Sequence, residues 1–141
     1  MAGVLRIYDQ PVPELLPRIL EVLGQGEPLP RWALLLLEGG DEELAQKVSE
    51  RQTGVPLTWD EMRALGPRLD SMTDIVLVGT RQPKVLESPR LKEEIFDDNC
   101  DRVEIALELF DATFWRIYAH DERILAPFKK AFQKVKGGAV E

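Results

Sequence analysis

The apolar stretch Trp32-Ala-Leu-Leu-Leu-Leu37 decides the fold class that the sequence predicts. It shows no alternation of polar and apolar residues, which is typical of a strand covered on both faces. A second unbroken apolar run of strand length, Asp74-Ile-Val-Leu-Val-Gly79, follows later in the chain. We therefore expect these two strands to lie side by side in the centre of a parallel or mixed sheet, with helices on both faces.

Further strands are predicted at both ends of the chain. Val4–Tyr8 is short, rich in β-branched and aromatic residues, and bounded by turn residues, so it is the first strand. Residues 102–110 alternate between apolar and polar side chains, which predicts a half-exposed strand. Asp111–Thr113 can then turn the chain into a strand over 114–118, giving an antiparallel pair, or the whole stretch forms one long bent strand.

Helices are predicted between these strands from capping residues and helical spacing. The best local pattern is Thr58 with Glu61, a capping box that starts a helix at Trp59. The other predicted helices begin near Leu16, after Asp41 and after Ser88-Pro89, and a last one opens at Asp121-Glu122 and carries an apolar face as far as Val135. Pro127 should bend this last helix or delay its start by a turn.

These elements predict one domain over residues 1–141, in which 138–141 form a flexible tail. A chain of about 150 residues buries roughly 70% of its unfolded surface, which is enough for a core without disulfides or metals. The predicted fold class is α/β or α+β. Its mixed sheet has about five strands, with helices packed on it, and the chain ends in a strand pair and a C-terminal helix.

Several protein classes are excluded by composition. The longest unbroken apolar stretch has six residues, from Trp32 to Leu37, whereas a membrane-spanning helix needs about 20. The N-terminus has neither a basic leader nor an apolar run before a cleavage site. The single cysteine, Cys100, fits a reducing compartment. We therefore expect a cytoplasmic protein with no membrane partner.

The charge balance points to the kind of partner. The net charge is -7, and residues 1–60 carry 10 acidic and 5 basic side chains. This composition argues against a nucleic-acid partner, because DNA and RNA binding leaves a basic footprint and only the end of the last helix, Lys129–Lys136, offers one. An acidic surface is suited to binding a basic protein, because opposite potentials speed association and reject wrong partners.

Nine side chains are predicted to form the partner-binding surface. Two acidic groups and two aromatic anchors of the kind enriched at interfaces make up the set. Its members are Glu38, Asp41, Glu42 and Glu43, then Asp97, Asp98 and Asp101, and finally Trp59 and Trp115.

The sequence predicts no catalytic residues, no metal site and no cofactor. Cys100 sits among acidic residues, which favour its protonated and weakly nucleophilic form, so a pair with His120 is disfavoured. The leading hypothesis is a non-enzymatic protein-binding module, in its most concrete version an immunity protein or antitoxin that faces a basic toxin. The alternative is a small-molecule or phosphate-handling α/β enzyme, whose site would gather Asp9, Glu38, Asp41 and Thr80 beyond the carboxyl ends of the strands.

Overall fold

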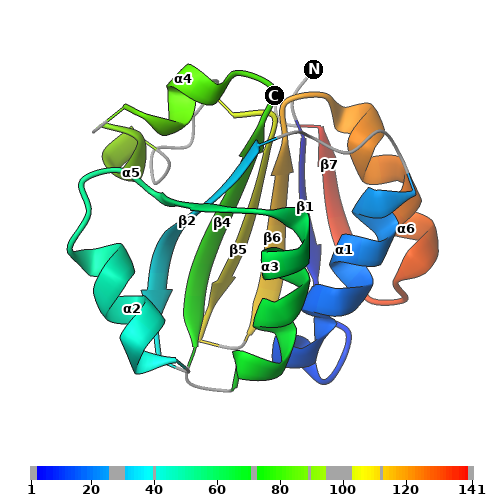
Figure 1. The fold of residues 1–141 in the computed structure, drawn as a ribbon. Helices are drawn as coiled ribbons and strands as arrows, with labels where there is room; N and C mark the ends of the chain where they lie inside the picture. Colours follow the sequence, from blue (N-terminus) through cyan, green and yellow to red (C-terminus); the bar gives the residue numbers. More distant parts are fainter. Residues whose placement is uncertain are drawn as a thin grey trace.

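One seven-stranded sheet organises the computed structural model, which describes residues 3–25, 31–39, 41–70, 73–88, 90–94, 103–111 and 113–139. The strand order is β3-β2-β4-β5-β6-β1-β7, and every neighbouring pair is antiparallel (Figure 1). The strands are β1 (Gly3–Ile7), β2 (Arg31–Glu38), β3 (Val55–Leu57), β4 (Asp74–Thr80), β5 (Ile105–Phe110), β6 (Phe114–Ala119) and β7 (Val135–Ala139).

The two apolar stretches form neighbouring strands, as predicted, but the predicted mixed sheet is wrong. β2 pairs with β4 in antiparallel register, for example Leu34 opposite Leu77. An unbroken apolar run reports that a strand is covered on both faces, and it carries no information about the direction of the neighbouring strand. The fold is therefore a single α+β domain with an antiparallel sheet.

The C-terminal region contains the largest departure from the sequence prediction. The last helix, α6 (Ala126–Ala131), ends before Val135, because Phe132 is already extended. The chain then adds β7 beside β1, where Gly137 has a φ of +115° and a β-carbon would lie 2.3 Å from the carbonyl oxygen of Val4. Only glycine accommodates this conformation and this close approach. Two residues of the predicted tail, Gly138 and Ala139, belong to β7.

Most helix boundaries follow the capping residues that predicted them. Helix α1 begins at Leu16 with a proline in its first turn, Asp41 caps α2, and the capping box of Thr58 and Glu61 opens α3. Pro127 lies in the first turn of α6, after a 3-10 turn, as expected for a delayed start. The helices are α1 (Leu16–Gly24), α2 (Glu42–Ser49), α3 (Trp59–Leu65), α4 (Pro83–Leu86), α5 (Leu91–Glu94) and α6 (Ala126–Ala131).

The stretch over residues 105–119 is a hairpin and not one bent strand. β5 and β6 pair from Ile105 opposite Ala119 to Phe110 opposite Phe114. Asp111 opens the turn with a φ of 54°, the left-handed conformation that aspartate tolerates better than most residues. The backbone N–H of Asp111 donates to Oδ1 of Asp74 at 2.9 Å, which holds the turn against the start of β4.

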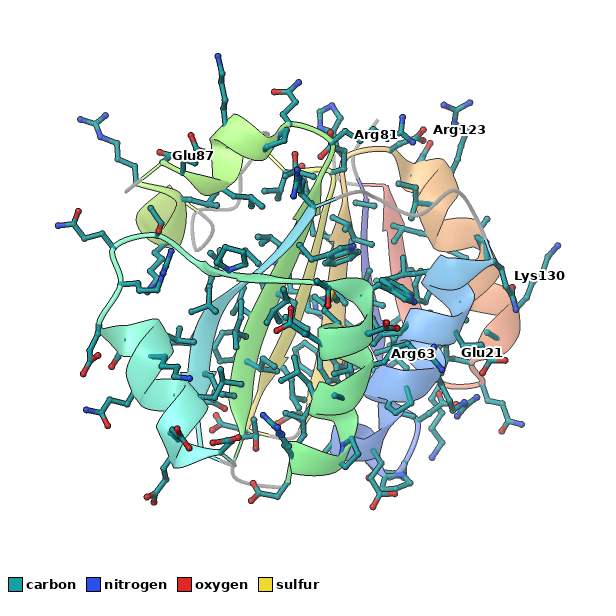
Figure 2. All side chains as sticks on the ribbon, viewed as in Figure 1. Glu21, Arg63, Arg81, Glu87, Arg123 and Lys130 are labelled. Carbon is teal, nitrogen blue, oxygen red and sulfur yellow. The ribbon has the colours of Figure 1, made fainter. Side chains whose placement is uncertain are left out.

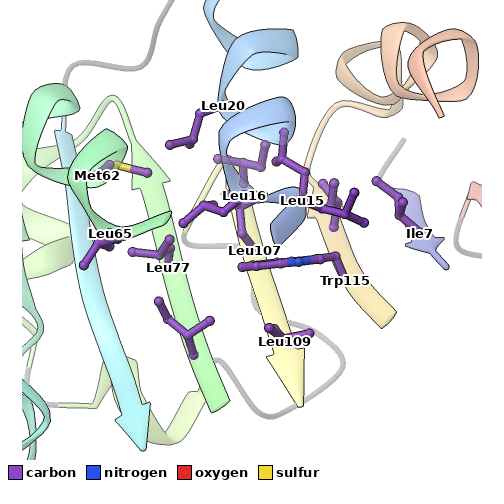
Figure 3. Close-up of a cluster of buried hydrophobic side chains, with 14 of the residues drawn as sticks. Ile7, Leu15, Leu16, Leu20, Met62, Leu65, Leu77, Leu107, Leu109 and Trp115 are labelled. Carbon is purple, nitrogen blue, oxygen red and sulfur yellow. The ribbon is translucent and has the colours of Figure 1, made fainter. Parts of the chain in front are cut away.

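The buried side chains form two hydrophobic clusters, one on each face of the sheet. The larger cluster lies under α1, α3 and α6, which cover one face of the sheet (Figures 1 and 3). On the opposite face, Val85 and Leu86 of α4 and Leu91 of α5 pack over Ala33 and Val78. The prediction of helices on both faces is therefore confirmed. None of the helices in the described ranges has the length and apolar character to cross a membrane.

Candidate functional site

Three acidic residues lie in a row where β2 ends, β4 begins and the β5–β6 hairpin turns. Glu38 at the end of β2 is paired with Asp74 at the start of β4, and Asp74 accepts the hydrogen bond from Asp111 in the hairpin turn. Glu38 and Asp111 are exposed, and Asp74 is half-buried. Sequence reasoning missed Asp74 and Asp111, because only the register of the strands places them beside Glu38.

Helix α2 adds two more carboxylates to this end of the sheet. It follows β2 closely, and Glu42 and Glu43 are both exposed in its first turn. We call Glu38, Glu42, Glu43, Asp74 and Asp111 the acidic end. Two of the predicted residues on this helix therefore keep the solvent-facing position that partner binding requires.

Asp41 lies between β2 and α2, and two interactions within the protein make its side chain less available to a partner. Its Oδ1 accepts the backbone N–H of Leu44 at 3.1 Å, which makes it the N-cap of α2. Its Oδ2 lies 3.0 Å from Nη1 of Arg68, in an ion pair with half-exposed side chains. The charge of Asp41 is thus largely matched within the protein.

We expect Asp41→Ala to lower the free energy of unfolding by about 1 kcal/mol, because an N-cap is lost and a surface ion pair adds little. Asp41→Asn retains the capping oxygen and should stay within about 0.5 kcal/mol of the wild type. Urea denaturation followed by circular dichroism measures both. Equal losses in the two variants would show that the ion pair, and not the cap, stabilises this helix.

Trp59 occupies the position expected of an aromatic contact residue. It is half-buried at the start of α3, and its ring centroid lies 6.0 Å from that of Trp32. It lines an open groove between α1 and α3, to which α1 contributes Glu21 and α3 contributes Arg63 (Figure 2). The other lining residues are Pro17, Leu20, Gly24, Gln25, Asp60 and Ala64.

The structure corrects the expectation for Trp115. This side chain is 0% exposed and lies in the core beneath Leu15 and Leu16 (Figure 3). Its indole N–H donates to the carbonyl oxygen of Val12 at 2.8 Å. Alternation along β6 placed Trp115 on one face of the strand, but the sequence did not indicate that this face is the one under α1. Trp115 is therefore a core residue and is not part of the binding surface.

The second predicted acidic group, Asp97, Asp98 and Asp101, lies outside the described residues, as does Cys100.

The residues of the alternative enzymatic site do not share one edge of the sheet. Because β4 runs antiparallel to β2, Thr80 at the end of β4 lies at the opposite end of the sheet from Glu38. The pairings through β5 and β6 make β1 run in the same direction as β2, so Asp9 lies at the end that holds Glu38. In parallel sheets, ligands bind beyond the carboxyl ends of the strands, which all lie at one edge. In this antiparallel sheet the carboxyl ends of neighbouring strands lie at opposite edges, so these side chains are separated.

Asp9 holds the connection that leads into β7. Its carboxylate, on a residue only 9% exposed, accepts the backbone N–H of Gln133 at 3.0 Å and that of Lys134 at 2.7 Å. Desolvation alone would raise the pKa of Asp9, but these two donors, together with the charges of Arg18 and Lys134, lower it below its ordinary value. Asp9 is thus an ionised structural group with both oxygens engaged.

A polar pocket lies at the opposite end of the sheet, near Arg81 (Figure 2). Its ionisable lining residues are Lys84, Glu104 and His120, and Oε2 of Glu104 accepts the backbone N–H of Arg81 at 3.0 Å. In the described part of the chain no group of three or more His, Cys, Asp or Glu residues could hold a metal ion. His120 and Lys84 therefore line the same pocket, but its described residues do not form the ligand set of a metal centre.

Comparison of the chain with protein-family models, with curated proteins and with solved structures finds no match.

Proposed function

We propose that this protein is a non-enzymatic cytoplasmic binding module that holds a basic partner protein against its acidic end. The observation that carries the proposal is the convergence of Glu38, Asp74 and Asp111 in one row, with Glu42 and Glu43 on the adjoining helix. Like charges at this spacing repel one another. A basic partner relieves that repulsion and gains from long-range attraction on approach.

Its most concrete version is an immunity protein or antitoxin that blocks a basic toxin. Inhibition of this kind needs a rigid surface of one charge sign, because pre-organisation lowers the entropic cost of binding. The acidic end meets this need, since strand pairing sets the row of three carboxylates and a capped helix carries the other two. The groove beside Trp59 is a second contact region, where an apolar side chain of the partner could anchor.

The test is affinity capture from the native host with charge-matched variants. The acidic-end variant combines Glu38→Gln, Glu42→Gln and Glu43→Gln. Its control combines Glu50→Gln, Glu87→Gln and Glu122→Gln, which changes the net charge equally outside the acidic end and the groove. We expect wild type and control to recover the same basic protein, and recovery by the acidic-end variant to fall about tenfold or more.

Salt dependence completes the measurement. Recovery by the wild type should fall steeply as the salt concentration rises from about 50 mM to 300 mM, because exposed charges are screened over shorter distances. If the two triple variants recover the same partner equally, the acidic end is not the binding surface. Recovery that is insensitive to salt would also contradict the proposal.

A further inference from the structure

Aromatic and basic side chains share the half of one sheet face that lies beyond the α4 and α5 cluster. Strand alternation puts Arg6 of β1, and Tyr8 directly after β1, on this face, opposite the buried Leu5 and Ile7. Pairing places Arg116 beside Arg6 in β6, and Lys136 beside Arg6 in β7. Phe114 precedes Arg116 by two residues and is paired with Phe110, so both phenylalanines lie on the same face.

The aromatic rings and the cations of this face contact one another. The Tyr8 and Phe114 ring centroids lie 5.2 Å apart. The guanidinium of Arg6 lies 5.7 Å from the Phe114 centroid, and the ammonium of Lys136 lies 5.6 Å from that of Tyr8. Phe110, the last residue of β5, is 38% exposed. We call Arg6, Tyr8, Phe110, Phe114, Arg116 and Lys136 the aromatic–basic face.

Its local charge is opposite to that of the whole chain. Arg116 is paired with Glu108 at 3.0 Å, between side chains 26% and 8% exposed. In the described part of the chain neither Arg6 nor Lys136 has a carboxylate partner, and both are exposed. Lys134 is exposed too, and its carbonyl oxygen accepts the N–H of Tyr8 at 2.8 Å. At about 0.1 M salt charges are screened beyond about 10 Å, so this local excess acts on a ligand that touches the face.

From this juxtaposition we propose that the aromatic–basic face binds single-stranded nucleic acid, whose bases stack on the rings and whose phosphates meet Arg6, Lys134 and Lys136. Every base has a π-face, so stacking on exposed rings needs no particular sequence. The exposed cations Arg6, Lys134 and Lys136 supply the backbone contacts. The net charge of the chain argued against such a partner, because the sequence placed Lys134 and Lys136 at the end of a helix and gave no sign that β7 carries Lys136 next to Arg6.

The width of the face favours a nucleotide strand over an acidic protein. Four strands spaced about 4.8 Å apart span roughly 15 Å, and the residues of the aromatic–basic face occupy only two rows along them. A stable protein interface buries about 800 Å² on each partner, which a strip of this width does not supply. A single strand needs only a narrow line of rings and cations.

The test is fluorescence anisotropy of labelled oligo(dT) and oligo(rU) with the full chain at about 50 mM salt. We expect binding that weakens about 18-fold when the salt is raised fourfold, as three released counterions on a single strand imply. Arg6→Gln with Lys136→Gln should weaken binding at least about tenfold, and Phe114→Leu about fivefold or more, because one stacked ring is lost. The control variant, Lys129→Gln with Lys130→Gln, removes two exposed cations from α6, where Lys130 points away from the sheet (Figure 2).

Binding by this control should stay within about twofold of the wild type, because its cations lie outside the face. Thermal melting of each variant separates loss of binding from loss of folding. The proposal is overturned if the wild type does not bind at low salt, or if the two double variants bind alike. It is also overturned if poly-glutamate competes as well as the oligonucleotide does, since the face would then be a docking site for acidic protein. The acidic-end variant should bind the oligonucleotide at least as tightly as the wild type, so this result stands apart from the test of the proposed function.

Discussion

Replacing Trp115 with alanine is expected to lower the free energy of unfolding by about 3–5 kcal/mol, the largest effect of any single substitution considered for this protein. The side chain is fully buried between the sheet and α1, so its removal leaves a cavity (Figure 3). Its N–H also donates to the carbonyl oxygen of Val12 at 2.8 Å, and this buried hydrogen bond is lost in the variant. Chemical denaturation followed by fluorescence of the remaining tryptophans measures the loss.

Two further variants give this expectation its control. Trp115→Phe keeps most of the ring and loses the hydrogen bond, so we expect an intermediate cost of about 1–3 kcal/mol. Trp59→Ala removes a half-buried indole at the edge of a groove and should cost clearly less than Trp115→Ala. If Trp115→Ala were no more destabilising than Trp59→Ala, Trp115 would not be the core residue that its burial indicates.

Asp9→Ala is expected to lower the free energy of unfolding by about 2–4 kcal/mol at neutral pH. Two backbone N–H groups lose a charged acceptor, and a hydrogen bond to a charged group contributes about 1.5–3 kcal/mol. Asp9→Asn keeps one acceptor oxygen and should lose about half as much. Because these donors precede β7, hydrogen exchange in Val135–Ala139 should accelerate in both variants.

The pH dependence of this effect has a definite sign. The pKa of Asp9 is lower in the folded protein than its ordinary value of 3.8, so its ionised form stabilises the fold. That stability is fully present above about pH 4 and is lost as the pH falls through the lower pKa of the folded state. The difference between wild type and Asp9→Ala should therefore shrink as the pH falls below about 4. A difference that stayed constant down to pH 2 would contradict the role of the charge.

Local patterns predicted those elements whose causes lie within a few residues. The capping box at Thr58 and the cap at Asp41 placed the starts of α3 and α2 correctly. The apolar runs placed β2 and β4, and the alternation over residues 102–110 placed β5, although the predicted half-exposed character is wrong because Ile105 to Leu109 are all buried. In each case the hydrogen bond or the hydrophobic face that stabilises the element is encoded in adjacent positions.

Elements that depend on distant residues could not be predicted in this way. Lys134 and Val135 fit the spacing of the preceding helix, yet Val135 pairs with Ile7, more than a hundred residues earlier. β3 is three residues long and is stabilised by its pairing with β2, so it leaves almost no pattern of its own. Such pairings outweigh weak local preferences, and only the folded chain reveals them.

The two proposed binding surfaces also contain residues that local patterns could predict and residues that only strand register brings together. Glu42 and Glu43 could be assigned to an exposed helix turn from the sequence, because they follow a cap. The row of Glu38, Asp74 and Asp111 is built by three segments that meet only through strand register. The aromatic–basic face likewise takes its members from β1, β5, β6 and β7.

The sequence by itself determined which stretches are buried strands, where most helices begin, and that the chain carries an excess of negative charge. These properties depend on neighbouring residues or on composition alone. The tertiary structure decided the direction of the strands, the addition of β7, the burial of Trp115 and the grouping of charges into an acidic end and an aromatic–basic face. The physical reason is that strand direction and register join residues far apart in the chain, and only the most favourable packing of the whole core selects among the possible pairings.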